Sequence, residues 1–184
     1  MTYKMNIAGL ERDLPICPVD DELSIAAFVI FGDIELTEAC ARELLKLMPE
    51  CDYMIAPEAK AIPLIYEMAK QSGRNDYFLA RKTPKLYMEG VFEATVKSIT
   101  TQGEQKLYMD GADAKQMCGK RVVLIDDVIS TGESMEVLES LVNKAGGIVV
   151  GRMAVLAEGK AADRDDILFL KKLPLFNADG TVKE

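Results

Sequence analysis

The sequence predicts an α/β fold with an open, mainly parallel sheet flanked by helices. Two observations predict it: short apolar runs of strand character alternate with segments whose apolar residues repeat at helical spacing, and the turns between them are short. The chain has 184 residues, of which 49% are hydrophobic and 28% are charged, as in ordinary globular domains. We therefore expect residues 1–184 to form a single domain.

The elements follow one another in an order that suits right-handed crossovers between parallel strands. Three helices are predicted, each with its apolar residues on one face: residues 37–48, 62–71 and 133–145. Five short apolar strands are predicted: residues 52–56, 77–80, 121–125, 148–156 and 167–170. Residues 1–35 show no regular period.

One hairpin interrupts this alternation. Residues 91–99 and 105–110 are typical of extended chain, and residues 100–103 supply a turn between them. We expect this hairpin to be the one antiparallel feature of the domain and to form a flap over residues 86–110.

Charge and residue counts exclude several classes of function. The chain has 22 basic and 30 acidic residues, a formal charge of −8 and no histidine. The sequence pI of about 4.8 argues against a basic face for nucleic acid, and the lack of histidine excludes His-based triads. No apolar run approaches the ~18 residues of a membrane span, and the first residues lack a signal-peptide pattern. Because its four cysteines are scattered, we expect a cytoplasmic protein.

Residues 122–134 carry the chemistry that the sequence predicts. Four apolar residues form a strand and deliver Asp126 and Asp127 to its carboxyl end, where ligands bind in open parallel sheets. Small and hydroxyl-bearing residues then open a helix, whose N–H groups and dipole form an anion site suited to a phosphate. A sugar fits between the two parts, because its hydroxyls donate to the carboxylates while its phosphate occupies the loop. The motif therefore predicts a ribose 5-phosphate ligand.

Three alternatives explain this motif less well. A nucleotide hydrolase with acids at the end of a strand needs a G-x-x-x-x-G-K-[ST] loop, which the chain lacks. A receiver domain uses acids at strand ends to hold Mg²⁺, but it does not need the Ser-Thr-Gly-Glu-Ser sequence that follows here. The two acids could also be solvated residues that cap the helix.

Residues 122–134 resemble the phosphoribosyl diphosphate (PRPP) signature of type I phosphoribosyltransferases, and the resemblance extends over residues 35–160. Residues 56–61 are similar to the pyrophosphate loop of adenine phosphoribosyltransferases, and residues 80–85 to an Arg-Lys-Pro-Gly-Lys stretch of those enzymes. Residues 93–106 resemble the flap of bacterial xanthine phosphoribosyltransferases. The resemblance implies transfer of the phosphoribosyl group from PRPP to a purine base, with pyrophosphate as the second product, in purine salvage.

The same resemblance implies a role for each candidate site residue. The catalytic residues are Asp126 and Asp127, which bind the ribose hydroxyls directly or through Mg²⁺. The 5-phosphate binds to Ser130, Thr131, Gly132, Glu133 and Ser134. The pyrophosphate binds to Glu58, Ala59, Lys60, Arg81, Lys82 and Lys85. Two interpretations of Glu58 stay open, since it either caps the following helix or orders the pyrophosphate loop.

The choice of base depends on the N-terminal segment and the flap. By resemblance, residues 1–35 form a small hood in which Phe31 binds the base. Adenine enzymes have a Phe-Arg-Asp-Ile segment here and a Glu-Tyr pair in the flap, whereas residues 31–34 read Phe-Gly-Asp-Ile and the flap has no such pair. An apolar hood favours adenine; xanthine or hypoxanthine, or a PRPP-sensing regulator without catalysis, are the alternatives. The resemblance also implies a Mg²⁺ cofactor and a homodimer, and we expect no nucleic-acid or membrane partner.

Overall fold

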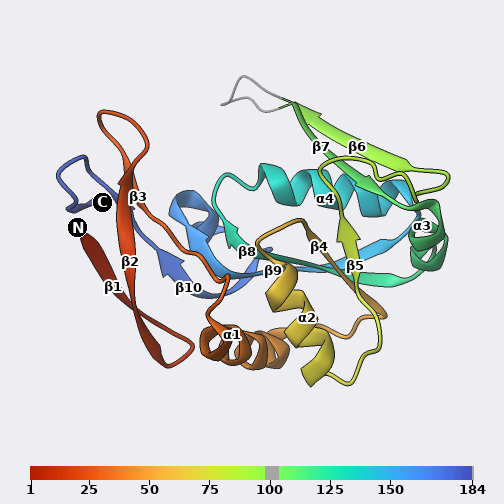
Figure 1. The fold of residues 1–184 in the computed structure, drawn as a ribbon, viewed down its shortest axis with the longest axis horizontal. Coiled ribbons are helices and arrows are strands. Elements are labelled where there is room, and N and C mark those ends of the chain that lie inside the picture. The colour runs from red at the N-terminus through yellow and green to blue at the C-terminus, as the bar shows by residue number, and fades with distance from the viewer. Residues whose placement is uncertain (98–103, 184) are drawn as a thin grey trace.

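The computed structural model, which describes residues 1–97 and 104–183, is built around a parallel sheet of five strands (Figure 1). The strand order is β10-β9-β8-β4-β5, and every neighbouring pair runs parallel. These strands are β4 Tyr53–Pro57, β5 Phe78–Ala80, β8 Arg121–Ile129, β9 Ile148–Glu158 and β10 Leu168–Leu173. The arrangement confirms the predicted α/β class with its mainly parallel sheet.

Helices cover both faces of this sheet, α1 and α2 on one face and α4 on the other (Figure 1). Alternate side chains of β8 explain this, because Val123 and Ile125 pack in the core beneath α1 and α2 while Val122 and Leu124 pack beneath α4. The helices are α1 Ile34–Leu47, α2 Ile62–Gln71, α3 Gly111–Met117 and α4 Glu133–Lys144, with a 3-10 turn at Gly159–Asp163. Across the described ranges, no helix has the length and apolar character needed to cross a membrane.

A second sheet of five strands corrects the expectation that the hairpin is the one antiparallel feature. Its order is β1-β2-β3-β11-β12, and its neighbours pair antiparallel. The strands are β1 Thr2–Ile7, β2 Leu10–Pro18, β3 Ser24–Ala26, β11 Leu175–Phe176 and β12 Val182–Lys183. The rings of Tyr3 and Phe176 meet edge to face with centroids 5.1 Å apart. The N-terminal segment thus forms a sheet with the C-terminal segment, and both chain ends lie on this side of the molecule (Figure 1).

The hairpin that the sequence predicts is formed by β6 (Phe92–Lys97) and β7 (Glu104–Met109), which pair antiparallel. The turn predicted at residues 100–103 lies outside the described residues. Ala94 and Leu107 of the hairpin are buried in the same core as the apolar face of α4. The hairpin therefore packs over α4 (Figure 1), and it is joined to the edge of the parallel sheet where Tyr108 of β7 and Arg81, directly after β5, exchange two backbone hydrogen bonds of 2.8 Å.

Several element boundaries differ from the sequence prediction, and two of these differences, in α1 and β8, bear on the site. Helix α1 begins at Ile34 because Asp33 caps it, with its carboxylate accepting a hydrogen bond from the Leu36 N–H at 3.0 Å. Strand β8 continues four residues beyond the predicted end, since it pairs with β9 as far as Ile129 and Ala157. The two acids therefore lie inside the strand and not after it.

The short helix α3 has no counterpart in the sequence prediction. It holds seven residues, and Asp110 caps it by accepting from the Ala112 N–H at 2.8 Å. A helix of two turns repeats its apolar pattern too few times to be recognised by period alone.

Candidate active site

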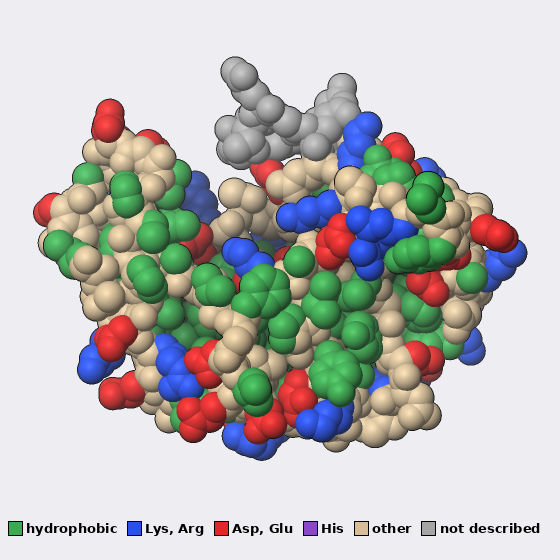
Figure 2. All heavy atoms as spheres, in the orientation of Figure 1, with side chains coloured by type: hydrophobic (Ala, Val, Ile, Leu, Met, Phe, Trp, Pro, Cys, Tyr) green, Lys and Arg blue, Asp and Glu red, His purple; other side chains and the backbone are tan. Residues whose placement is uncertain are grey.

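A cavity of about 790 Å³ opens at the carboxyl ends of the parallel strands. Figure 2 shows a hollow there, between the part of the molecule that carries the antiparallel sheet and the part that carries the hairpin, with Lys and Arg side chains around its rim. The cavity is lined by residues 25–29, 57–60, 105–108 and 126–128 and by Lys82, Ser130, Ser134, Glu158 and Leu173. Most of the candidate residues therefore meet at one place, at the edge of the sheet where ligands bind in such folds.

Asp126 and Asp127 form the buried floor of this cavity, with 7% and 6% of their surface exposed. The backbone N–H of Asp127 donates to the Asp126 carboxylate at 2.8 Å. Asp127 Oδ2 is buried and has no hydrogen-bond partner among the described residues. Burial and then the neighbouring Asp127 charge raise the pKa of Asp126 well above its usual value, while Lys60 acts in the opposite direction. Such a pair is suited to bind hydroxyl donors or a cation.

The chain turns from β8 into α4 over the residues predicted to bind a phosphate. Gly132 has φ +87°, in the left-handed region that favours glycine. Glu133 begins the helix, and its N–H donates to Thr131 Oγ1 at 3.4 Å. Ser130 and Ser134 line the cavity, whereas the three residues between them do not. Apart from that of Glu133, the N–H groups of the first helical turn are available to an anion.

Gln105 of β7, which is not among the residues predicted from the sequence, connects the hairpin to this loop. Its Oε1 accepts a hydrogen bond from the Ser134 hydroxyl at 3.2 Å, and its Nε2 donates to Glu133 Oε2 at 3.4 Å. The Glu133 carboxylate therefore faces the hairpin. No sequence signal marks Gln105, because its partners lie 28 and 29 residues further along the chain.

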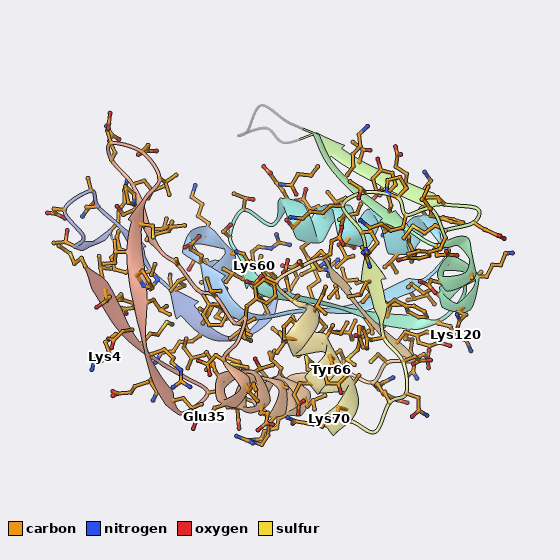
Figure 3. All side chains as sticks on the ribbon, in the orientation of Figure 1. Lys4, Glu35, Lys60, Tyr66, Lys70 and Lys120 are labelled. Carbon is orange, nitrogen blue, oxygen red and sulfur yellow. The ribbon has the colours of Figure 1, made fainter. Side chains whose placement is uncertain are left out.

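The loop at residues 58–60 joins β4 to α2 and forms another wall of the cavity. Glu58 does not cap α2, whose first residues have no side-chain cap, so that interpretation is wrong. Its Oε1 accepts from the Lys82 N–H at 2.6 Å, and its Oε2 lies 2.7 Å from Arg81 Nε. Glu58 therefore ties this loop to the segment after β5, as in the other interpretation. Figure 3 shows Lys60 at the centre of the molecule, where the loop leaves β4.

The structure divides the candidate cations into two groups. Lys60 and Lys82 line the cavity. Arg81 and Lys85 do not, since Arg81 is held in the ion pair just described and Lys85 Nζ donates to Thr83 Oγ1 at 2.9 Å.

Phe31, the residue predicted to bind the base, lies outside the cavity wall and is 48% exposed. Residues 25–29, which precede it, line the cavity instead. The predicted N-terminal segment thus contributes to the site through β3 and the residues after it.

Glu158 is a further lining residue that the sequence analysis did not select. It lies at the carboxyl end of β9, two residues beyond the predicted end of that strand. Burial raises the pKa of Glu158, and the nearby Lys60 charge acts in the opposite direction. The signal that could have found it is an acid at the carboxyl end of an apolar strand, which is the signal that identified the acids of β8.

Three comparisons with known proteins agree with this geometry. Adenine phosphoribosyltransferase of Thermotoga petrophila is 36% identical over 84% of this chain and 88% of its own length. The crystal structure of adenine phosphoribosyltransferase from Thermoanaerobacter pseudethanolicus superposes with a TM-score of 0.65, at 26% identity, over 78% of this chain and 84% of that chain. Hypoxanthine/guanine phosphoribosyltransferase of Methanothermobacter thermautotrophicus is 32% identical over 71% of this chain and 62% of its own length.

The model of the phosphoribosyl transferase domain family matches residues 36–179. This range contains the whole parallel sheet, the hairpin and every residue of the two loops that line the cavity. The chain therefore belongs to the phosphoribosyl transferase family and is an enzyme of that family, similar to its adenine phosphoribosyltransferases.

Proposed function

We propose that the protein transfers the 5-phosphoribosyl group of PRPP to adenine, which releases pyrophosphate and gives adenosine monophosphate. The observation that carries this proposal is the meeting, in one cavity, of two buried carboxylates, a loop at a helix N-terminus and two lysines, Lys60 after β4 and Lys82 after β5. A phosphorylated sugar with a pyrophosphate group offers a partner to each of the three. The names of the relatives favour adenine as the acceptor.

The orientation of PRPP follows from the chemistry of each wall. The 5-phosphate binds at the start of α4, where Ser130 and Ser134 supply hydroxyl donors and residues 131–133 supply backbone N–H groups. The ribose 2- and 3-hydroxyls donate to Asp126 and Asp127. These assignments account for the buried Asp127 Oδ2, which a hydroxyl donor would satisfy.

The pyrophosphate binds on the other side of the acids, at the loop after β4. Residues 58–60 offer backbone groups, and Lys60 and Lys82 neutralise the charge of the leaving group. Arg81 acts there through Glu58, because its ion pair fixes the position of the loop. Lys85 lies on the same segment, within reach of Thr83 in this structure, and remains a candidate for the same role.

The two carboxylates fit Mg²⁺ as a cofactor. The described residues hold no group of three acidic, Cys or His side chains that could bind a metal by themselves. Mg²⁺ is commonly held by one or two carboxylates together with substrate oxygens and water, and two adjacent buried acids favour a cation over two bare negative charges. When bound with PRPP, Mg²⁺ would neutralise part of the charge on the departing pyrophosphate.

The residues of the cavity stabilise both charges that form as the C1–oxygen bond breaks. Negative charge grows on the pyrophosphate, opposite the lysines, and positive charge grows on the ribosyl ring, beside Asp126 and Asp127. Because the acids are buried, their attraction for the positive ring is weakened little by water. The nitrogen of the base then forms the new bond at C1, and the proton it gives up passes to the departing pyrophosphate or to water.

A homodimer, which the family resemblance implies, has support on the surface of the molecule. Large hydrophobic side chains stay exposed on α2 and in the segment after β5: Tyr66 is 55% exposed, Tyr87 is 68% exposed and Leu86 is fully exposed. Hydrophobic side chains gather on the face where α2 lies (Figures 1 and 2), and Tyr66 is on that helix (Figure 3). Light scattering during size-exclusion chromatography is expected to give twice the mass of one chain.

The cysteines support a reducing compartment. Cys17, Cys40, Cys51 and Cys118 are all free thiols, as expected for an enzyme of the cytoplasm.

The test of the proposed function is product identification. Incubation with PRPP, Mg²⁺ and adenine is expected to give adenosine monophosphate and pyrophosphate in equal amounts by phosphorus NMR. The variant Asp127→Asn is expected to lose about 10²-fold in turnover, whereas the matched control Asp165→Asn, at an exposed acid, keeps the wild-type rate. Loss of PRPP without adenosine monophosphate, or equal rates in both variants, would overturn the proposal.

A further inference from the structure

The order of strands in the parallel sheet sets the order of sites along the cavity. The loop after β4 carries Lys60 and the segment after β5 carries Lys82, β8 carries the two acids, and β9 and β10 contribute Glu158 and Leu173. Neighbouring strands lie about 4.8 Å apart, so that these groups follow one another across the mouth of the sheet. Glu158 and the loop at residues 58–60 therefore lie on opposite sides of the two acids.

The proposed reaction needs the leaving group, the ribose and the base to lie in this order across the sheet. Bond formation at C1 and departure of pyrophosphate take place on opposite faces of the carbon when the displacement is in line. With the pyrophosphate on the β4 side and the ribose over Asp126 and Asp127, the base enters from the side of β9 and β10. Residues 25–29 also line the cavity, and they lie on that side because β3 pairs with β11, which directly follows β10.

The wall on this side is apolar apart from a single acid. Residues 25–29 read Ile-Ala-Ala-Phe-Val, and Leu173 of β10 pairs with Glu158 in the sheet register. Glu158 is the one titratable residue that β9, β10 and residues 25–29 contribute to the described lining. Within the described part of the chain its carboxylate takes part in no hydrogen bond or ion pair, and Lys60 is the charge that acts on it.

We propose that the Glu158 carboxylate accepts a hydrogen bond from the 6-amino group of the purine and so selects aminopurines over 6-oxopurines. The inference rests on the proposed function and identifies the residue that determines the specificity of the enzyme for its purine base. An ionised carboxylate accepts hydrogen bonds and donates none. The amino group of adenine satisfies it, whereas the oxygen of a 6-oxopurine would place lone pairs against a half-buried negative charge.

The enzyme is expected to discriminate against bases that leave the Glu158 carboxylate without a hydrogen-bond donor. A site built to bond a substrate N–H rejects the analogue that lacks it, because the acceptor is left without a partner in a water-poor wall. The loss of one hydrogen bond to a charged group corresponds to about 10- to 100-fold in kcat/KM. Unsubstituted purine, which carries hydrogen in place of the amino group, measures this loss directly.

The experiment compares adenine, unsubstituted purine and hypoxanthine in the wild-type enzyme, in Glu158→Gln and in the matched control Glu38→Gln, whose side chain is exposed on α1. Wild type and control are expected to prefer adenine to purine by at least about tenfold in kcat/KM. In Glu158→Gln the amide oxygen can still accept from the amino group but carries no negative charge, so the rate with adenine falls by about tenfold while the rate with purine stays within about threefold. Hypoxanthine gains relative to adenine in this variant, because the amide that replaces the carboxylate can donate to the oxygen of the base.

The opposite results overturn the inference. A general disturbance of the fold would lower the rates with adenine and purine together and leave their ratio unchanged, which would contradict the role of Glu158. If Glu158→Gln does not fold, the wild-type series still decides, since equal rates with adenine and purine would refute recognition of the amino group. Wild type without turnover on any base would overturn the proposed function itself, whereas turnover with adenine and an unchanged ratio in the variant would overturn the Glu158 inference alone.

Discussion

Asp126→Asn is expected to make the unliganded protein more stable while it removes activity. The substitution keeps the size of the side chain and an oxygen that can accept from the Asp127 N–H. In the wild-type protein this N–H lies 2.8 Å from the Asp126 carboxylate oxygen. It removes a charge that is 7% exposed and adjacent to a second buried carboxylate. Turnover is expected to fall by about 10²-fold, because the positive ribosyl ring loses one of its two acids.

The size of the stability gain follows from the raised pKa of Asp126. A carboxyl whose pKa is raised by one unit on folding destabilises the folded state by about 1.4 kcal/mol once it is ionised. In a chain of this length each kcal/mol corresponds to about 2–4 °C in Tm. Since burial and the Asp127 charge raise the pKa of Asp126 well above its usual value, we expect Tm to rise by at least about 3 °C at pH 7.5.

The pH dependence of the gain has a defined sign. Below the usual Asp pKa of 3.8 the wild-type carboxyl is neutral in the folded and unfolded protein, and the variant gains little. As the pH rises through the raised pKa of the folded protein, wild type loses stability that the variant keeps. The difference in Tm therefore grows from pH 4 to neutral pH.

Calorimetry of wild type, Asp126→Asn and the exposed control Asp165→Asn from pH 4 to pH 8 measures this difference. Addition of PRPP with Mg²⁺ is expected to stabilise wild type more than Asp126→Asn, which reverses their order. An Asp126→Asn variant that is less stable than wild type at pH 7.5, or a difference that does not change with pH, would refute the reasoning.

Three further substitutions test the two loops and the start of α1. Gly132→Ala is expected to raise the KM for PRPP about tenfold, because φ is +87° and the new Cβ would meet Arg164 Nη1 at 2.8 Å; an unchanged KM would contradict this account of the turn. Glu58→Gln is expected to weaken pyrophosphate binding about tenfold in titration calorimetry, since it removes the ion pair with Arg81 at 2.7 Å, and equal affinities would exclude an ordering role. Asp33→Ala is expected to cost about 1 kcal/mol and lower Tm by about 2–4 °C at pH 7. Because Arg12 lowers the pKa of Asp33, wild type keeps this contribution above pH 3.8 and loses it as the pH falls through the folded pKa, so that a deficit that persisted at pH 2 would count against the cap.

The sequence predicts the parallel sheet well because its strands are defined by local patterns. Residues 122–125 of β8 are apolar on both faces of the sheet, which gives a continuous apolar run that the sequence shows directly. Helices α1, α2 and α4 carry one apolar face each, and Gly146 marks the end of α4. The spacing of apolar residues and the glycine or proline residues at the ends of segments are enough to predict these elements.

The second sheet depends on contacts that no local pattern reveals. Strand β3 has three residues and pairs with β11, about 150 residues further along the chain. The turn between β1 and β2 is Ala8-Gly9, with φ +51° and +89°, and it lacks the Asn-Gly or Asp-Gly pair that marks such turns. The segment therefore has no signal of its own until its partner is known.

The candidate site divides in the same way. Asp126, Asp127 and the loop before α4 are consecutive in sequence, and one motif identifies them together. Gln105 and Glu158 enter the cavity from β7 and β9. Gln105 is marked only by its place in three dimensions, whereas Glu158 follows the apolar run of β9 beyond the end predicted for that strand. Phe31, to which the sequence resemblance pointed, does not line the cavity in this structure, whereas residues 25–29 do.

Pyrophosphate release from PRPP and Mg²⁺, with adenine, guanine, hypoxanthine, xanthine and uracil supplied one at a time, tests the central claim most directly. We expect rapid release with adenine and release at least about 10²-fold slower with each of the other bases. Faster release with hypoxanthine or xanthine would keep the transfer reaction and contradict the assignment of adenine. If no base causes pyrophosphate release while calorimetry still shows that PRPP binds, the claim of catalysis is contradicted and the protein is a PRPP sensor.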